Sequence, residues 1–161
     1  MNTVRMLDGP EVFDRAMRAL LKLSGASFYR VPYGPGEEHV AVVDMPGRGH
    51  LAPLVMLHGF SASGPSQYTR LALRLRPHFR RILIPDLPAH GASSTPEPLV
   101  GDDLQRGLDA ALDHALDPRA SALIFASSMS GGLAIRYAAE NASRVGALML
   151  CSPGGAPLTD V

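Results

Sequence analysis

Short apolar runs alternate with helix-length segments along most of the chain. From residue 51 onward, four runs of four or five apolar residues are separated by longer segments, and in the clearest of these the apolar residues recur three and four positions apart. Continuous apolar runs are typical of parallel strands covered on both faces, and the longer segments are typical of the covering helices. The pattern predicts strands at 53–57, 82–85, 122–126 and 147–151, and helices at 66–76, 102–116 and 130–141. This alternation indicates a mostly parallel, doubly wound α/β sheet, in which a site lies at the carboxyl ends of the strands.

The first fifty residues carry a different pattern. A helix start near residue 10 is followed by a segment, ending near residue 23, with apolar residues on one face. That face consists of Phe13, Met17, Leu20 and Leu21. Two β-rich runs at 27–31 and 39–45 are separated by a turn sequence, which predicts a pair of strands at the sheet edge. We expect residues 1–26 to be a helical extension of one domain spanning 1–161.

Composition narrows the classes of partner. The 161 residues are 46% hydrophobic and 19% charged, and 15 basic side chains balance 15 acidic ones. One buried core is expected, without a basic patch for nucleic acid or anionic lipid. No apolar stretch is long enough to cross a bilayer, no motif indicates a metal or nucleotide, and the single Cys151 suits a reducing compartment. We expect a cytoplasmic protein without a cofactor that acts on a small molecule, and neither nucleic acid nor membrane as a partner.

Two of the predicted strands end in loops with unusual sequence. His58-Gly59-Phe60 follows the first, and its glycine permits a tight turn that leaves the Phe60 N–H facing the crevice, although a plain glycine turn has the same sequence. The second loop begins at Asp86 and contains His90 and Gly91 among other small and turn-forming residues. We assign it a shaping role and expect Asp86 and His90 to make structural hydrogen bonds, not to form a catalytic dyad.

A third strand end carries the strongest candidate chemistry. Ala126-Ser127-Ser128-Met129-Ser130 lies between a strand and a helix and fits a nucleophile elbow, in which the residues two before and two after the nucleophile are small. Small residues are needed there because strand and helix approach closely around a strained turn. Ser128 then sits at the helix N-terminus, where the Met129 N–H can stabilise an oxyanion. A serine-rich helix cap is the plain alternative.

These segments together resemble the α/β-hydrolase family. The stretches LVMLHGF, RRILIPDLPAHGASS and ALIFASSMSGG occur in the order and spacing of that family, and the likeness runs from about residue 27 to the end. The resemblance implies a serine hydrolase with Ser128 as nucleophile and the backbone N–H groups of Phe60 and Met129 as oxyanion hole. It implies structural roles for His58 and Gly59 beside the first donor, and for the Asp86–His90–Gly91 loop. Members that open epoxides or displace halide differ, since their nucleophile is an aspartate.

The chain departs from the family pattern at three glycine positions. Ala126 and Ser130 flank the elbow, and Ala89 replaces a third glycine. All three are small, so the elbow remains possible. Because Ser128 to Gly132 also reads small-x-Ser-x-small, Ser130 is a rival nucleophile; we prefer Ser128, which keeps the register of the following helix.

The resemblance also implies a catalytic acid and histidine later in the chain. All six histidines precede Ser128, and the acids after it are Glu140 and Asp160, of which only Asp160 is conceivable as the catalytic acid. Three interpretations follow: an N-terminal part of a serine hydrolase that cleaves small ester-like substrates through an acyl-enzyme, a binding protein without the chemistry, or one half of a split enzyme. If the core stops after its sixth strand, we expect the exposed edge to favour self-association and the chain alone to be inactive.

Overall fold

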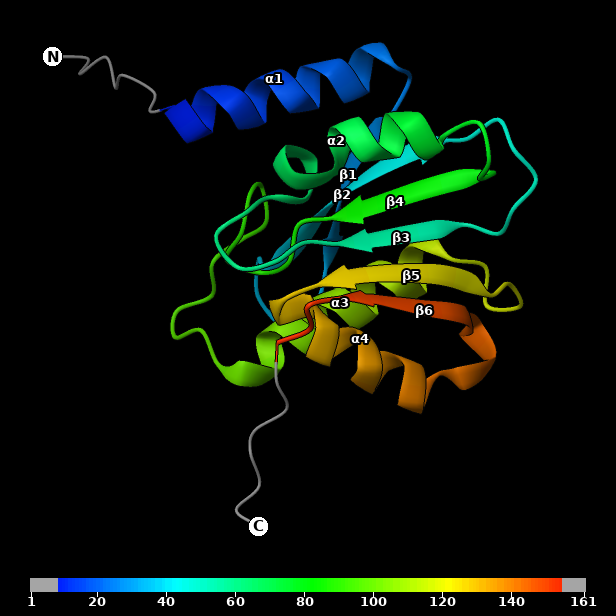
Figure 1. Cartoon of the computed structure of the whole chain (residues 1–161). Coiled ribbons are helices and arrows are strands. Elements are labelled where there is room, and N and C mark those ends of the chain that lie inside the picture. The colour runs from blue at the N-terminus through cyan, green and yellow to red at the C-terminus, as the bar shows by residue number, and fades with distance from the viewer. Residues whose placement is uncertain (1–8, 155–161) are drawn as a thin grey trace, which may run out of the picture.

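The computed structural model describes residues 9–154, which form one mixed sheet with helices on both faces (Figure 1). The elements are α1 (Gly9–Leu23), β1 (Ser27–Pro32), β2 (His39–Pro46), β3 (Leu54–Leu57), α2 (Gly64–Leu75), β4 (Arg81–Pro85), α3 (Gly101–Ala115), β5 (Ala122–Ser127), α4 (Met129–Glu140), a short 3-10 helix (Ala142–Arg144) and β6 (Val145–Cys151). Every predicted strand and helix is present. The boundaries move by a few residues; α2 begins earlier because Ser63 caps it and Pro65 suits its first turn.

The strand order is β1-β2-β4-β3-β5-β6. β1 pairs with β2, and β2 with β4, in antiparallel register, whereas β4, β3, β5 and β6 are parallel neighbours. The prediction of a parallel α/β sheet is thus confirmed, with the two antiparallel strands of the first fifty residues added at one side. β3, β4 and β5 are neighbouring parallel strands, so their carboxyl ends lie at the same end of the sheet. The loops that begin at His58, Asp86 and Ser128 follow these three ends.

The helices form two layers. α1 and α2 lie on one face, and α3 and α4 on the other (Figure 1). Each layer has its own apolar cluster. Tyr68 and Ala72 of α2 pack with Met56 and Ile84, whereas Leu108 and Leu112 of α3 pack with Leu57, among other residues, on the opposite face. The middle of the sheet is covered on both faces by these clusters, as the continuous apolar runs predict.

Two elements at the periphery expose apolar side chains. In α1, Leu21 is buried, but Phe13 and Leu20, predicted on the same face, are exposed. The difference arises because α1 packs on α2 and only part of its apolar face is covered by that contact. β6 is the last strand of the sheet, and Met149 in it is 60% exposed. Self-association through this edge stays a prediction. Within residues 9–154, no helix is long and apolar enough to cross a membrane.

Candidate active site

Ser128 occupies a strained turn between β5 and α4. Its backbone has φ 50° and ψ −120°, outside the regions that side chains other than glycine prefer. Such a conformation costs about 1–3 kcal/mol and persists only where its surroundings hold it. The Ser128 N–H donates to the Cys151 carbonyl at 3.0 Å, and the Ser128 carbonyl accepts from Gly131 and Gly154. The side chain is exposed, and in the described part of the chain its hydroxyl has no hydrogen-bond partner.

Ser130 has the opposite environment. It is fully buried on the first turn of α4. Its hydroxyl lies 2.8 Å from the Leu57 carbonyl and 3.0 Å from that of Ser127, and it accepts the Ser127 N–H at 3.2 Å. This hydroxyl joins the ends of β3 and β5 and is closed to a ligand. Ala126, also buried, lies in β5 beside Leu57 of β3.

The loop after β3 lies directly against this turn. A Cβ placed on Gly59 would come within 3.3 Å of the Ser128 Cβ, so a glycine keeps the two segments close. His58 is buried and accepts the Leu87 N–H on Nε2 at 2.9 Å. Its Nδ1 therefore carries the proton and donates to the Gly59 carbonyl at 2.8 Å. Burial lowers the pKa of His58, so the ring is neutral and both its nitrogens are engaged.

The bond from His58 also sets the direction of the next N–H. In a trans peptide the carbonyl and the following N–H point opposite ways, and the peptide joining Gly59 to Phe60 is trans. Because the Gly59 carbonyl faces His58, the Phe60 N–H points away from it. Within residues 9–154 this N–H donates no hydrogen bond, and neither does that of Met129 at the first position of α4. Among the described residues, two N–H groups thus have no acceptor: that of Phe60, which follows Gly59 in the β3 loop, and that of Met129, which follows Ser128.

Asp86 organises the loop after β4. Its buried carboxylate accepts the Gly64 N–H at 2.7 Å and the Ala92 N–H at 2.9 Å, and it pairs with Arg18 of α1 at 2.6 Å. Gly91 has φ 55°, and a Cβ there would lie 2.3 Å from the Asp86 carboxylate, so the loop requires a glycine at this position. One carboxylate thereby ties α1, the start of α2 and the β4 loop together.

His90 lies beside the other two loops. Its Nδ1 donates to the Pro88 carbonyl at 2.8 Å. Its ring stands 5.0 Å from that of His58 and meets the Phe60 ring edge-on at 5.8 Å. His90 therefore packs against the loop that presents the Phe60 N–H. Neither it nor Asp86 hydrogen-bonds the other.

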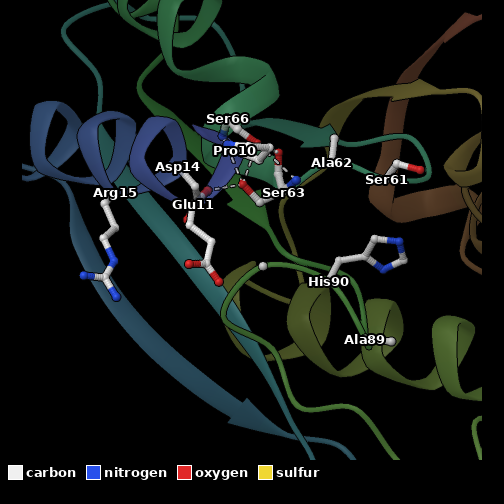
Figure 2. Close-up of a pocket in the computed structure, with 11 residues that line it drawn as sticks. Pro10, Glu11, Asp14, Arg15, Ser61, Ala62, Ser63, Ser66, Ala89 and His90 are labelled. Atoms are coloured by element: carbon white, nitrogen blue, oxygen red, sulfur yellow. Dashed lines mark hydrogen bonds between the residues drawn. The ribbon is translucent and has the colours of Figure 1, made fainter. Parts of the chain in front are cut away.

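A cavity of about 460 Å³ opens between the start of α1, the loop before α2 and the loop containing His90 (Figure 2). Asp14, Ser63 and Ser66 cluster on one wall, and the His90 ring stands apart from them on the Ser61 side. Asp14 pairs with Arg18 and accepts from Ser63. Ser128 does not line this cavity. The described residues contain no cluster of three potential metal ligands.

Two side chains of α2, Gln67 and Tyr68, contact Ser127 next to Ser128, and no sequence pattern indicates these contacts. The Tyr68 hydroxyl lies 3.0 Å from the Leu57 carbonyl and 2.8 Å from the Ser127 Oγ, and burial raises its pKa. Gln67, the preceding residue in α2, bonds both Gly59 and Ser127. No motif marks these side chains, because their partners lie up to sixty residues away. Asp160, the conceivable acid, lies outside the described residues.

Comparisons with known proteins agree with this geometry. A family model described as the alpha/beta hydrolase fold matches residues 52–160. A "Putative non-heme haloperoxidase" of Mycobacterium phage D29 is 39% identical over 101 residues, which cover 62% of this chain and 35% of that protein. The chain thus spans about a third of the length of this relative.

Solved structures are also similar to this chain, which covers less than half of each of the two described next. A haloalkane dehalogenase from Agrobacterium tumefaciens superposes with a TM-score of 0.68 and 27% identity over 80% of this chain and 41% of that one. An alpha/beta hydrolase from Sphaerobacter thermophilus gives a TM-score of 0.62 and 26% identity over 76% and 44%. With its sheet, its three strand-end loops and a family match over more than half its length, the chain belongs to the α/β hydrolase fold family.

Proposed function

We propose that this chain supplies the nucleophile and the oxyanion hole of a serine hydrolase acting on a small ester or a related carbonyl compound. The observation that carries the proposal is the setting of Ser128: an exposed hydroxyl on a positive-φ turn, at the N-terminus of α4 and against Gly59. The burial of Ser130 supports this choice between the two serines, since an enclosed hydroxyl with three backbone contacts is not free to attack.

The reaction follows from these positions. The Ser128 Oγ attacks the carbonyl carbon as a base takes its proton, and the carbonyl oxygen becomes an anion. The N–H groups of Phe60 and Met129 stabilise that anion, aided by the positive end of the α4 dipole. The leaving alcohol departs with a proton from the base, which leaves an acyl-enzyme. Water then adds to the acyl carbon by the same route in reverse and releases the acid.

The base is not among the groups that contact Ser128. His58 is neutral with both nitrogens engaged, and His90 donates Nδ1 to its own loop. We propose that a histidine outside the described residues, in the same polypeptide or in a partner, takes the proton. We propose in addition that the substrate is a small molecule and that the protein is cytoplasmic.

A second candidate is a binding protein that keeps the pocket without the chemistry. It is favoured by one observation, that no described histidine hydrogen-bonds Ser128. The two candidates differ in covalent reactivity once imidazole is added as an external base in place of the missing histidine. A Ser128 hydroxyl beside two oriented N–H groups then reacts with an activated phosphonate, whereas a serine in the wall of a plain binding pocket does not.

The test is irreversible labelling. The chain is incubated with a short alkyl fluorophosphonate and with imidazole as an external base, and is followed by intact-mass spectrometry over hours, beside Ser128→Ala and Ser130→Ala. We expect one phosphonyl group per chain, retained in Ser130→Ala and absent in Ser128→Ala. Labelling that survives Ser128→Ala would contradict the assignment, and reversible ester binding without any labelling would favour the binding protein.

A further inference from the structure

The side-chain amide of Gln67 joins the two segments that carry the proposed oxyanion donors. Gln67 lies in the first half of α2. Its Oε1 accepts the Gly59 N–H at 3.0 Å, and its Nε2 donates to the Ser127 Oγ at 2.8 Å. Gly59 directly precedes Phe60, and Ser127 directly precedes Ser128. One side chain therefore bridges the β3 loop and the β5 turn at the point where they meet.

The chemistry of the partners fixes the orientation of this amide. The Gly59 N–H can only donate, so the atom facing it must be the Gln67 oxygen. The nitrogen is then directed at two hydroxyls, those of Ser127 and Tyr68, the latter at 3.0 Å. The Tyr68 hydroxyl continues to the Leu57 carbonyl at the end of β3. The result is a closed network from β3 through α2 to β5, with the reversed amide orientation excluded by a donor-to-donor contact.

The bridge acts on the peptide next to the one that carries the donor. Gln67 holds the Gly59 N–H, and His58 holds the Gly59 carbonyl. With both polar groups of Gly59 fixed, rotation about its two backbone bonds is restricted, and the direction of the Phe60 N–H is set. Without Gln67, Gly59 is held only by the hydrogen bond from His58 to its carbonyl, and a glycine has broad conformational freedom.

We propose that Gln67 is a positioning residue of the proposed hydrolase site, which aligns the Phe60 N–H with the Met129 N–H across Ser128. The inference rests on the proposed function. An oxyanion donor acts only when it lies about 2.7–3.1 Å from the anion, and loss of one donor costs on the order of 10²–10³ in rate. A displaced donor retains part of its effect, so we expect a loss of about 10-fold or more without Gln67.

Gln67 suits a test by substitution because its side chain is at the surface and outside both apolar clusters. Gln67→Leu removes the hydrogen bonds to Gly59 and Ser127 and keeps a side chain of similar volume. Gln105→Leu is the control: it makes the same change at a buried position of α3, where the amide bonds Asp109 on its own helix. Gln67→Glu keeps an acceptor for the Gly59 N–H, and the Ser127 hydroxyl can rotate to donate to the second oxygen.

Two measurements separate the bridge from its consequence. Solvent exchange of the Gly59 amide, followed by NMR on ¹⁵N-glycine-labelled chain, reports the bridge itself. We expect exchange about 10-fold faster in Gln67→Leu and unchanged in Gln67→Glu and Gln105→Leu. The rate of fluorophosphonate labelling with imidazole present, followed by intact mass over a concentration series, gives the maximal labelling rate kinact and the half-saturating concentration KI. We expect kinact to fall about 10-fold or more in Gln67→Leu with KI unchanged, and neither to change in Gln105→Leu.

Other outcomes overturn the inference in distinguishable ways. Unchanged Gly59 exchange in Gln67→Leu would show that the bridge does not hold the loop. Faster exchange with an unchanged kinact would reduce Gln67 to a loop contact, and a change in KI alone would make it a substrate contact. If the wild-type chain takes no label at Ser128 while Gly59 depends on Gln67 for protection, the proposed function fails and the positioning role falls with it, although the bridge stands.

Discussion

Replacing Asp86 with alanine should destabilise the fold more than any other single loss of a carboxylate in the β2–β4 region. The carboxylate is buried and accepts two backbone N–H groups, from Gly64 and Ala92, besides its ion pair with Arg18. Alanine leaves both N–H groups without an acceptor, at about 1–3 kcal/mol each. The ion pair with Arg18 is lost as well, but at a smaller cost, because Arg18 keeps its ion pair with Asp14. We expect a total of about 3–5 kcal/mol, in the range for breaking a buried ion pair.

Asparagine at the same position gives a graded test. An amide can accept on its oxygen but must present its NH₂ group to one of the N–H donors now bound by Asp86. We therefore expect Asp86→Asn to cost about 2–3 kcal/mol, between alanine and the wild type. Asp44→Ala is the control, since the Asp44 side chain is partly exposed, pairs with Arg81 and accepts no backbone N–H from a described residue. Its expected cost is about 1 kcal/mol.

The assay is urea unfolding followed by far-UV circular dichroism, because the chain contains no tryptophan for fluorescence. The order Asp86→Ala, Asp86→Asn, Asp44→Ala should appear in the free energy of unfolding with an unchanged m-value. For a domain of this size, the alanine variant should also melt on the order of 10 °C lower. An Asp86→Ala cost within 1 kcal/mol of the Asp44→Ala cost would refute the idea that this carboxylate ties the three segments together.

Four further outcomes follow from the site. Because burial lowers the pKa of His58, the unfolded chain binds a proton at this residue more readily than the folded chain. The stability that His58 contributes is therefore intact above pH 6.5 and is lost as the pH falls below it. The free energy of unfolding should fall by at most about 1.4 kcal/mol per pH unit there, and by less in His58→Gln. Ser130→Ala should cost about 1–3 kcal/mol in urea unfolding yet keep fluorophosphonate labelling. Phe60→Ala and Met129→Ala should each change the labelling rate by less than 10-fold, since the proposed donors are backbone groups; a loss of 10² in a folded variant would argue against that role. The chain alone should hydrolyse p-nitrophenyl esters no faster than Ser128→Ala, and robust turnover that depends on Ser128 would show that a described histidine is the base.

Much of the scaffold could be predicted from the sequence because local patterns determine it. Strands buried on both faces must be apolar throughout, so β3, β4 and β5 stand out as short apolar runs. The close approach of strand and helix around Ser128 demands small neighbours, and those are visible as Ala126 and Ser130. Glycines with a steric reason, such as Gly91 against Asp86, are likewise visible as turn formers.

The long-range polar contacts could not be predicted, for a physical reason. Arg18 and Gln67 are ordinary residues on helix surfaces, and neither propensity nor periodicity distinguishes them from neighbouring polar residues. Their partners, Asp86 and Ser127, are 68 and 60 positions away. Only the packing of α1 on α2, and of α2 on the sheet, brings them together. The exposure of Phe13 has the same origin, since the amphipathic pattern of α1 does not reveal which part of its apolar arc finds a partner.

The most direct test of the nucleophile and its two donors is a crystal structure of the chain after reaction with a fluorophosphonate. We expect phosphorus bonded to the Ser128 Oγ, with the phosphonyl oxygen about 2.7–3.1 Å from the backbone nitrogens of both Phe60 and Met129. Phosphorus on Ser130 or on another residue, or a phosphonyl oxygen turned away from both amides, would contradict it.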